Sequence, residues 1–268
     1  MKDIYVLTGA TGGMGSDYAH NFKHDGILII SDLNQEKLET LKKELDKKDI
    51  NSEICVCDVS DKNSVNNLVE FTKSLGKFKT LIHMAGLPES NPNTDLIYQV
   101  NLIGTKYLMD SFYEICDNSI LLLIASMTGH LVPDSKLYNK TLLDPLNEKF
   151  LKKMKFFTQG KGTNAYAFAK KGMIMLVEKE VGKFAKKNTR IITISPGAVE
   201  TPMSSTDASD TSVIETFVKN TPIPRMAKPI EITKLLQYLC TEEASFINGT
   251  DILIDGGITS HMKYNKIF

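Results

Sequence analysis

Short apolar runs alternate with longer amphipathic segments along the whole chain. The apolar runs predict seven buried strands, over residues 4–8, 27–31, 53–59, 80–84, 120–125, 191–195 and 252–254. Apolar residues at helical spacing predict helices over 35–47, 63–75, 97–115, 165–186 and 229–240. This alternation favours a parallel sheet with helices on both faces, because right-handed crossovers place them there. We therefore expect an α/β fold with a doubly wound parallel sheet of about seven strands.

Two stretches interrupt the alternation within what we expect to be one domain, 1–268. Residues 127–163 form an insertion before the helix at 165–186, and part of it should be helical because long structureless loops are unusual in compact domains. The insertion could be a surface excursion, a lid over substrate or a subunit contact. Its apolar stripe would consist of Leu143, Leu146, Phe150, Leu151 and Met154. Residues 199–224 are expected to form a loop that closes over substrate.

The composition excludes several classes of function. Lysine plus arginine equals aspartate plus glutamate at 32 each, so neither nucleic acid nor a membrane is an expected partner. The four cysteines form no Cys-x-x-Cys or Cys/His cluster, so we expect no metal site and no disulfide framework. The chain has no apolar stretch of membrane-spanning length, and its N-terminal apolar run is too short for a signal peptide. By elimination, a cytoplasmic protein with a small-molecule substrate is expected.

A glycine-rich turn joins the first strand to a helical pattern. It reads Thr-Gly-Ala-Thr-Gly-Gly-Met-Gly over residues 8–15. Glycines let the backbone turn tightly and let a pyrophosphate approach the amides at a helix N-terminus. The position of the turn favours a dinucleotide site over a bare structural turn. The predicted cofactor contacts are Gly9, Thr11, Gly12, Gly13, Met14 and Gly15.

A carboxylate ends the second strand at Asp32, where the adenosine ribose of a dinucleotide should lie. It can accept hydrogen bonds from both ribose hydroxyls and would repel a 2′-phosphate, so NAD rather than NADP is the expected cofactor. Alternatively Asp32 caps the following helix, and the two roles can coexist. Leu33 would lie beside the ribose, and Asp58 and Val59 are candidates for contacting the adenine.

Tyr166 and Lys170 lie one helical turn apart, so their side chains should share a face. An ammonium near the phenol favours the phenolate and lowers the phenol pKa from about 10. Tyr166 could then exchange a proton near neutral pH, which is the acid/base chemistry of an alcohol or ketone oxidoreductase. By spacing alone, a Tyr and a Lys four residues apart on a helix are usually just ordinary neighbours.

Taken together, these motifs resemble the short-chain dehydrogenase/reductase family over nearly the whole chain. The family's glycine turn matches residues 8–15, and its Asn-Asn-Ala-Gly segment matches 83–86, His-Met-Ala-Gly here. The helix asparagine, the active-site serine and the Tyr-x-x-x-Lys pair correspond to Asn101, Ser126, Tyr166 and Lys170. The segment flanking the nicotinamide matches Ser195-Pro196-Gly197 and Glu200-Thr201-Pro202-Met203.

The resemblance implies a Rossmann-like fold and a role for each matched residue. Tyr166 would be the acid/base, Lys170 would stabilise its phenolate and bind the nicotinamide ribose, and Ser126 would hold the substrate oxygen. Asn101 would mark a helix kink that holds a water. Further cofactor contacts are expected from Ala85, Gly86, Pro196, Gly197, Val199 and Thr201.

The chain departs from the family pattern at two places. His83 and Met84 replace two asparagines, and a buried or sheet-edge histidine is favoured over a ligand or base. The second departure is the 40-residue step from Ser126 to Tyr166. This step resembles the subgroup that includes bacterial 3α-hydroxysteroid dehydrogenase/carbonyl reductases and coniferyl-alcohol dehydrogenase-like proteins.

The subgroup resemblance implies an NAD-dependent oxidoreductase for a hydroxysteroid, either a 3α-hydroxysteroid or a bile acid. The alternatives are a dehydrogenase for another bulky or aromatic alcohol and a non-catalytic NAD-binding regulatory protein. A homodimer or homotetramer is expected, with the long helices at 97–115 and 165–186 as the family's usual contact. The expected substrate-lining residues are Met127, Leu131, Val132, Met203 and Phe217.

Overall fold

The protein is described by a computed structural model that covers residues 2–202 and 217–265. Seven strands form one sheet in the order β3-β2-β1-β4-β5-β6-β7, and every neighbouring pair is parallel. The predicted fold class is confirmed. The strands are β1 (Asp3–Thr8), β2 (Ile27–Asp32), β3 (Ser52–Val56), β4 (Lys77–His83), β5 (Ile120–Ile124), β6 (Arg190–Pro196) and β7 (Asp251–Ile254).

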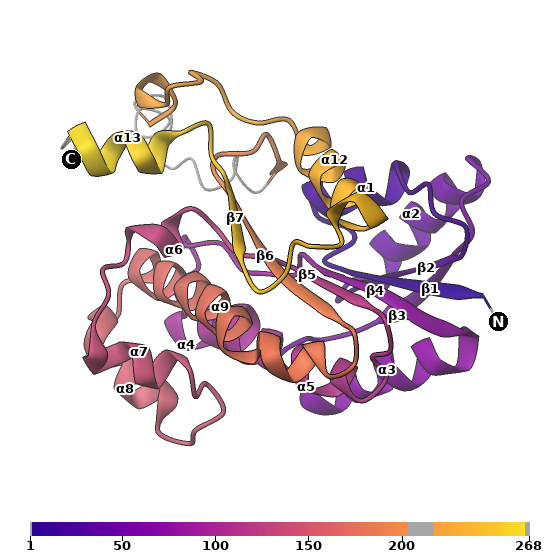
Figure 1. Cartoon of the computed structure of the whole chain (residues 1–268), viewed down its shortest axis with the longest axis horizontal. Coiled ribbons are helices and arrows are strands. Elements are labelled where there is room, and N and C mark those ends of the chain that lie inside the picture. Colours follow the sequence, from indigo (N-terminus) through magenta and orange to yellow (C-terminus); the bar gives the residue numbers. More distant parts are fainter. Residues whose placement is uncertain (1, 203–216, 266–268) are drawn as a thin grey trace.

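Helices cover both faces of this sheet (Figure 1). The α-helices before the insertion are α1 (Gly13–His20), α2 (Gln35–Asp46), α3 (Lys62–Leu75), α4 (Thr94–Tyr98) and α5 (Gly104–Tyr113). Those that follow it are α9 (Gly162–Ala185), α12 (Pro229–Leu239) and α13 (Ile258–Asn265). A π-helical segment, η1 (Gln99–Ile103), joins α4 to α5, and η2 (Glu242–Ala244) is a 3₁₀ turn.

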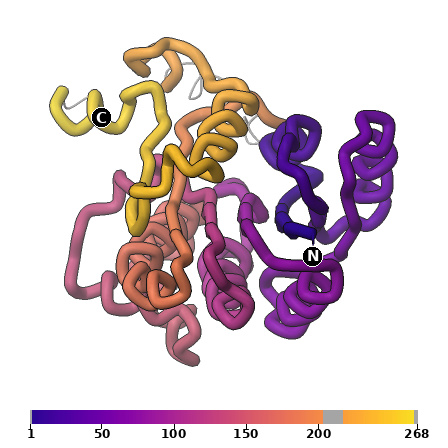
Figure 2. Tube along the Cα trace, turned by 45° about the vertical axis from the view of Figure 1, so that its right-hand side comes forward, coloured from indigo at the N-terminus to yellow at the C-terminus, as the bar shows by residue number. Residues whose placement is uncertain are grey.

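Alternate strand residues face opposite layers, because side chains alternate across a pleated strand. Ile4 and Val6 of β1 belong to a core shared with α3, α5 and α9. Tyr5 and Leu7 point the other way, into a core shared with α1, α2 and α12. Figure 2 shows α12 beside α1, so the C-terminal part of the chain closes over the N-terminal βα unit. Both faces of the sheet are therefore buried under helices. This agrees with the strand sequences, which are apolar at nearly every position.

Several predicted bounds differ from the structure. Strand β4 begins at Lys77 rather than at residue 80, and α9 begins at Gly162 rather than at residue 165. Two further differences have a local cause. The third strand ends at Val56 rather than at residue 59, because the Asp58 carboxylate accepts hydrogen bonds from the amide and hydroxyl of Ser60 and turns the chain. The predicted helix at 97–115 is composite, with α4, η1 and α5 in series. Apolar periodicity does not distinguish π from α hydrogen bonding, so only the family resemblance, through the kink expected at Asn101, pointed to this interruption.

The insertion forms three short helices, α6 (Thr128–Leu131), α7 (Lys136–Leu142) and α8 (Phe150–Thr158). Helices α7 and α8 pack on each other and on α9. Phe150 and Met154 of the predicted stripe are buried, Leu143 and Leu151 pack against the core, and Leu146 is 42% exposed. Among the described residues, no helix is both long and apolar enough to cross a bilayer.

Candidate active site

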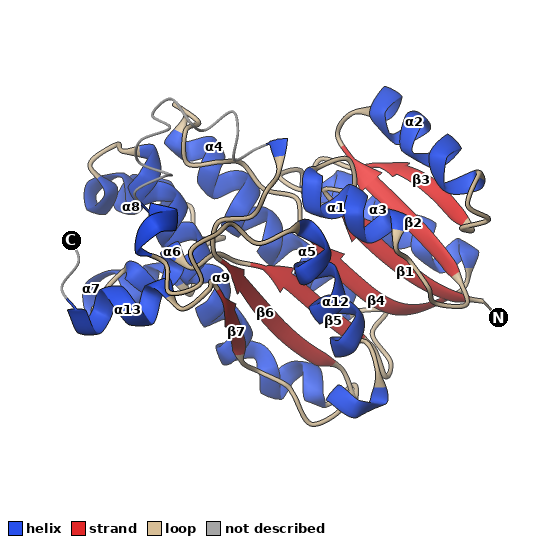
Figure 3. Ribbon diagram, turned by 90° about the horizontal axis from the view of Figure 1, so that it is seen from above, coloured by secondary structure: helices blue, strands red, loops and turns tan. Residues whose placement is uncertain are grey.

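The candidate site lies at the carboxyl ends of the strands, where the strand order reverses between β1 and β4 (Figure 3). Such a switch point leaves a crevice in doubly wound sheets. The glycine turn enters it directly after β1. Gly9 has φ +69°, and a Cβ there would lie 2.5 Å from the Ala85 amide nitrogen. A Cβ on Gly15 would lie 2.1 Å from the Gly9 carbonyl oxygen.

This turn fits a pyrophosphate by its construction. Only glycine allows the backbone of β1 to pass so close to Ala85 and to α1. The amides of the first turn of α1, at Gly13, Met14 and Gly15, have no partner within the helix and form the positive end of its dipole. A phosphate group could satisfy them.

Asp32 is tied to the glycine turn rather than to α2. Its Oδ2 accepts hydrogen bonds from the Thr11 amide at 3.0 Å and the Thr11 hydroxyl at 2.7 Å, and Oδ1 accepts from the Leu33 amide. Asn34 occupies the N-cap of α2, where its side chain accepts from the Lys37 amide. The alternative interpretation of Asp32 as the helix cap is therefore wrong, which leaves this carboxylate at the end of β2 beside the turn.

The predicted adenine contacts lie in the turn after β3. The Asp58 carboxylate accepts hydrogen bonds from the amide and the hydroxyl of Ser60. The Asp58 amide donates to the Ser64 hydroxyl. Val59 is 5% exposed, and its carbonyl oxygen lies 2.7 Å from where a Cβ on Gly104 would be. The backbone at 58–59 is thus fixed by the serine hydrogen bonds of Asp58 and by the close packing of Val59 on Gly104.

Tyr166 and Lys170 share one face of α9, as predicted. The Lys170 Nζ lies 5.5 Å from the centroid of the Tyr166 ring and donates a 2.8 Å hydrogen bond to the Ile124 carbonyl at the end of β5. Lys170 is 5% exposed. Burial lowers the pKa of its ammonium to about 8, because the charged form loses its hydration.

Ser126 follows β5 and accepts two hydrogen bonds from one residue. The Thr128 hydroxyl approaches its Oγ at 3.1 Å and the Thr128 amide at 3.3 Å. Since a hydroxyl has one proton and two lone pairs, this arrangement leaves the Ser126 proton available for another acceptor. Sequence reasoning missed Thr128, although a hydroxyl two residues after the matched serine was a usable signal.

Asn101 lies inside the π-helical segment and is completely buried. Its Oδ1 accepts from the Leu87 amide at 2.7 Å, and its Nδ2 donates to the Leu87 carbonyl at 2.9 Å. A Cβ on Gly86 would lie 3.0 Å from Asn101 Oδ1 and 3.7 Å from Lys170 Nζ. Asn101 therefore fixes the loop after β4 next to Lys170. The helix is interrupted by the π-helical segment at Asn101, where a kink was expected.

His83 is buried and fully paired. The Thr105 hydroxyl donates to the Asn101 carbonyl, so it accepts from the His83 Nε2–H at 3.1 Å. Nδ1 then accepts from the Thr8 hydroxyl at 2.8 Å. Burial, together with the Lys170 charge, lowers the His83 pKa to about 3. The neutral imidazole thus links β1 to η1 and α5, which agrees with the expected structural histidine.

The segment after β6 runs past the glycine turn. Ala227 bridges the chain by donating to the Ala198 carbonyl and accepting from the Glu200 amide. The amide and carbonyl of Val199 lie between these bonds and point away from Ala227. Thr201 lies over the turn, since a Cβ on Gly13 would be 2.7 Å from its Cβ. The Gly197 amide donates to the Ile254 carbonyl, and the Pro196 carbonyl accepts from the Met127 amide.

The predicted substrate-lining residues differ in exposure. Met127 and Val132 are 5% and 8% exposed, so most of their surface packs inside the protein. Leu131 is 41% exposed and Phe217 is half-buried. Met203 lies outside the described residues.

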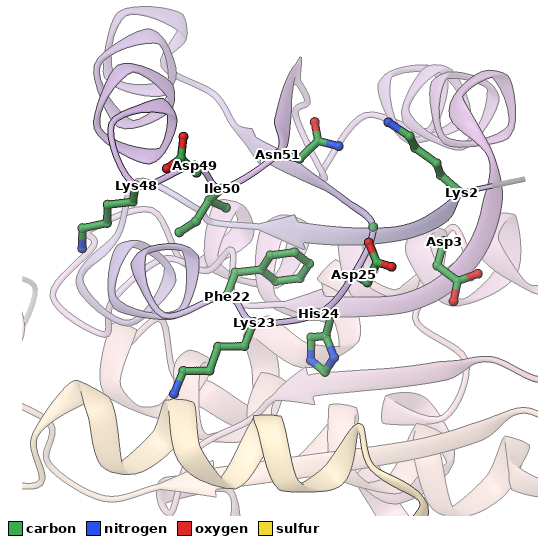
Figure 4. Close-up of a pocket in the computed structure, with 11 residues that line it drawn as sticks. Lys2, Asp3, Phe22, Lys23, His24, Asp25, Lys48, Asp49, Ile50 and Asn51 are labelled. Carbon is green, nitrogen blue, oxygen red and sulfur yellow. The ribbon is translucent and has the colours of Figure 1, made fainter.

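A separate hollow of about 690 Å³ opens at the opposite edge of the sheet (Figure 4). Phe22 lies in its middle, while Lys23 and Lys48 extend away from it. None of its lining residues belongs to the candidate site. Within the described ranges, no group of three or more His, Cys, Asp or Glu side chains could hold a metal ion.

Comparisons with known proteins agree with this geometry. Residues 3–135 match the family model described as short chain dehydrogenase, and residues 154–259 match the one described as enoyl-(acyl carrier protein) reductase. The oxidoreductase UcpA of Escherichia coli (strain K12) is 28% identical to this chain, covering 95% of it and 93% of the relative.

Two solved structures with the same fold carry different cofactors. A 7α-hydroxysteroid dehydrogenase complexed with NADH and 7-oxo glycochenodeoxycholic acid has a TM-score of 0.76 at 23% identity, covering 95% of this chain and 93% of that one. A variant of actinorhodin polyketide ketoreductase with NADPH has a TM-score of 0.77 at 20% identity, with coverages of 96% and 97%. At these identities the likeness shows the fold alone.

Proposed function

Because the chain belongs to the short-chain dehydrogenase/reductase family of oxidoreductases, we propose that it interconverts a secondary alcohol and a ketone with NAD. The observation that carries the proposal is the buried Lys170 ammonium, held by the Ile124 carbonyl and set 5.5 Å from the Tyr166 ring. This positive charge favours the phenolate of Tyr166 and lets it accept a hydroxyl proton. The nicotinamide, when bound, supplies or accepts the hydride.

Ser126 would hold the substrate oxygen. Thr128 occupies the lone pairs of the Ser126 Oγ, so the Ser126 proton is directed at the substrate. A donor in this position stabilises the negative charge that grows on the oxygen during reaction. In oxidation the alcohol proton passes to Tyr166, and in reduction Tyr166 returns it to the ketone oxygen.

Asp32 supports NAD as the cofactor. The turn beside it contains Thr11 and no lysine or arginine that could receive a 2′-phosphate. A ribose with two free hydroxyls could donate to the carboxylate, whereas a phosphate there would meet like charge. At the other end of the cofactor, Val199 offers a backbone amide and carbonyl that the Ala227 bridge does not use.

For the substrate we propose a bulky apolar alcohol or ketone, with a hydroxysteroid or bile acid as the first choice. The long step between Ser126 and Tyr166 and the resemblance of fold to a 7α-hydroxysteroid dehydrogenase support this choice. Another bulky or aromatic alcohol is the alternative. A non-catalytic NAD-binding role would not explain why Lys170 is buried beside Tyr166, or why Ser126 has a proton free for an acceptor.

The test is turnover on a panel of bile acids, androstane steroids and aromatic alcohols, followed by NADH absorbance. Tyr166→Phe should lower turnover by about 10²-fold or more while cofactor binding, measured by calorimetry, is retained. Near-normal turnover in that variant would contradict the proposed proton transfer. Tight NAD binding without turnover of any alcohol or ketone would favour the regulatory role.

A further inference from the structure

The exposed side of the α7–α8 hairpin concentrates positive charge. Five lysines, which we call the basic face, line it: Lys136 and Lys140 of α7, and Lys149, Lys152 and Lys153 at the start of α8. All five are exposed. Their spacing of three and four residues places each set on one side of its helix, because such positions are neighbours on a helix surface.

The positive charge of this face is only partly compensated locally, since Asp144 lies in the groove that Lys136, Lys140 and Lys153 line. Residues 136–161 contain seven lysines and only two carboxylates, although the chain as a whole is neutral. Across the described residues, no carboxylate lies within ion-pair distance of any of the five lysines. Other lysines near the insertion are engaged: Lys171 pairs with Asp134, and Lys179 donates to the Leu143 carbonyl.

Large apolar side chains stand among these lysines. Leu137 is 76% exposed and Phe156 is 80% exposed. Both border a groove of about 600 Å³ that is also lined by Lys136, Lys140 and Lys153. Phe156 lies on the same side of α8 as Lys149, Lys152 and Lys153 by helical spacing. Exposed leucine and phenylalanine of this size, grouped together, mark an interaction surface rather than a solvated one.

We propose that the basic face, with Leu137 and Phe156, binds the surface of an anionic lipid bilayer. A cluster of lysines on a helical surface is attracted by acidic headgroups, and neighbouring Phe and Leu side chains can enter the boundary between headgroups and acyl chains. A second copy of this chain fits less well, because a two-fold contact would place the lysines of one copy against those of the other. The whole-chain neutrality does not exclude this partner, since only local charge acts within a Debye length.

The hairpin is placed so that binding leaves the fold intact. Helices α7 and α8 lie at the outside of the molecule next to α9, on which they pack (Figures 1 and 3). Their buried residues, Phe150 and Met154, face the protein, so the lysines and Phe156 are free to meet lipid. Membrane binding through this face would not require the proposed reaction and can be measured without it.

Co-sedimentation of the full-length protein with vesicles tests the proposal. The protein should bind vesicles of phosphatidylglycerol in phosphatidylcholine, not vesicles of phosphatidylcholine alone, and added salt should weaken binding. Lys152→Glu with Lys153→Glu should lower the partition coefficient by about tenfold or more. Lys43→Glu with Lys47→Glu is the matched control, with the same charge change at exposed positions in the last turn and at the C-cap of α2, and should bind as the wild type does.

Three results would overturn the proposal. The first is an absence of wild-type binding to anionic vesicles, and the second is an equal loss in the α2 control. The third comes from Leu137→Ser with Phe156→Ser, checked by circular dichroism for folding and by light scattering for mass. If this variant lowers the oligomeric state and leaves vesicle binding unchanged, the face is a contact between copies of the chain.

Discussion

Lys170→Met should stabilise the protein at neutral pH while abolishing catalysis. Methionine has a similar length but no charge. It removes an ammonium that is 5% exposed and whose pKa is lowered to about 8 from its ordinary value of 10.5. Between these two values the unfolded chain binds more protons than the folded one, so wild-type stability rises with pH there. The penalty for keeping Lys170 charged amounts to about 3 kcal/mol at pH 7 and about 1 kcal/mol at pH 9.5.

The variant also leaves the Ile124 carbonyl without its donor, which costs about 1–3 kcal/mol at every pH. The stability of Lys170→Met relative to wild type should therefore fall by about 2 kcal/mol between pH 7 and pH 9.5. Urea unfolding at both pH values measures this change, with far-UV circular dichroism as the signal because the chain has no tryptophan. Titrating groups that lie away from Lys170 are common to both proteins and cancel. Tyr166 is coupled to Lys170, so both proteins are compared in a Tyr166→Phe background, which removes the phenol. A difference that does not change with pH would refute the lowered pKa.

Three further variants probe other parts of the site. Asp32→Ala should weaken NAD binding and relax discrimination against NADP; unchanged preference in cofactor titrations would show that the carboxylate serves only the turn. Thr128→Val should lower kcat about 2- to 10-fold without changing cofactor affinity, because Ser126 loses a donor worth about 0.5–1.5 kcal/mol, whereas Thr128→Ser should retain activity. His83→Leu should lower the free energy of unfolding by about 1–3 kcal/mol, since the Thr8 hydroxyl loses its buried acceptor; His83→Asn, which can still accept, should lose less.

Much of the fold followed from local patterns. Each strand was visible as an apolar run, and the largest errors at the strand ends were three residues. They fall at the start of β4 and at the end of β3, where the Asp58 turn cut the strand short. The glycine turn was recognisable because the requirement for glycine arises from nearby residues. Gly9 has a positive φ, and Gly15 lies so close to the Gly9 carbonyl oxygen that it has no room for a Cβ. The Tyr166 and Lys170 pair was recognisable because one helical turn fixes their common face.

The surroundings of these residues were not readable from the pattern. Lys170 is buried against the Ile124 carbonyl, 46 positions away, and they meet because α9 packs on β6, the neighbour of β5 in the sheet. The Asp32 carboxylate could equally have capped α2, and the contact with Thr11, 21 positions earlier, decided between the two. His83 similarly depends on hydroxyls from β1 and α5.

The insertion shows the same division. Its apolar stripe predicted helices, and Phe150 and Met154 are buried as a stripe requires. Which surface it covers, and which lysines it leaves without partners, depended on how α7 and α8 pack on α9. Periodicity and glycine requirements are properties of neighbouring residues, so the linear sequence contains them. Burial, pKa and hydrogen-bond partners arise between residues distant in the chain, and they exist only once the chain has folded.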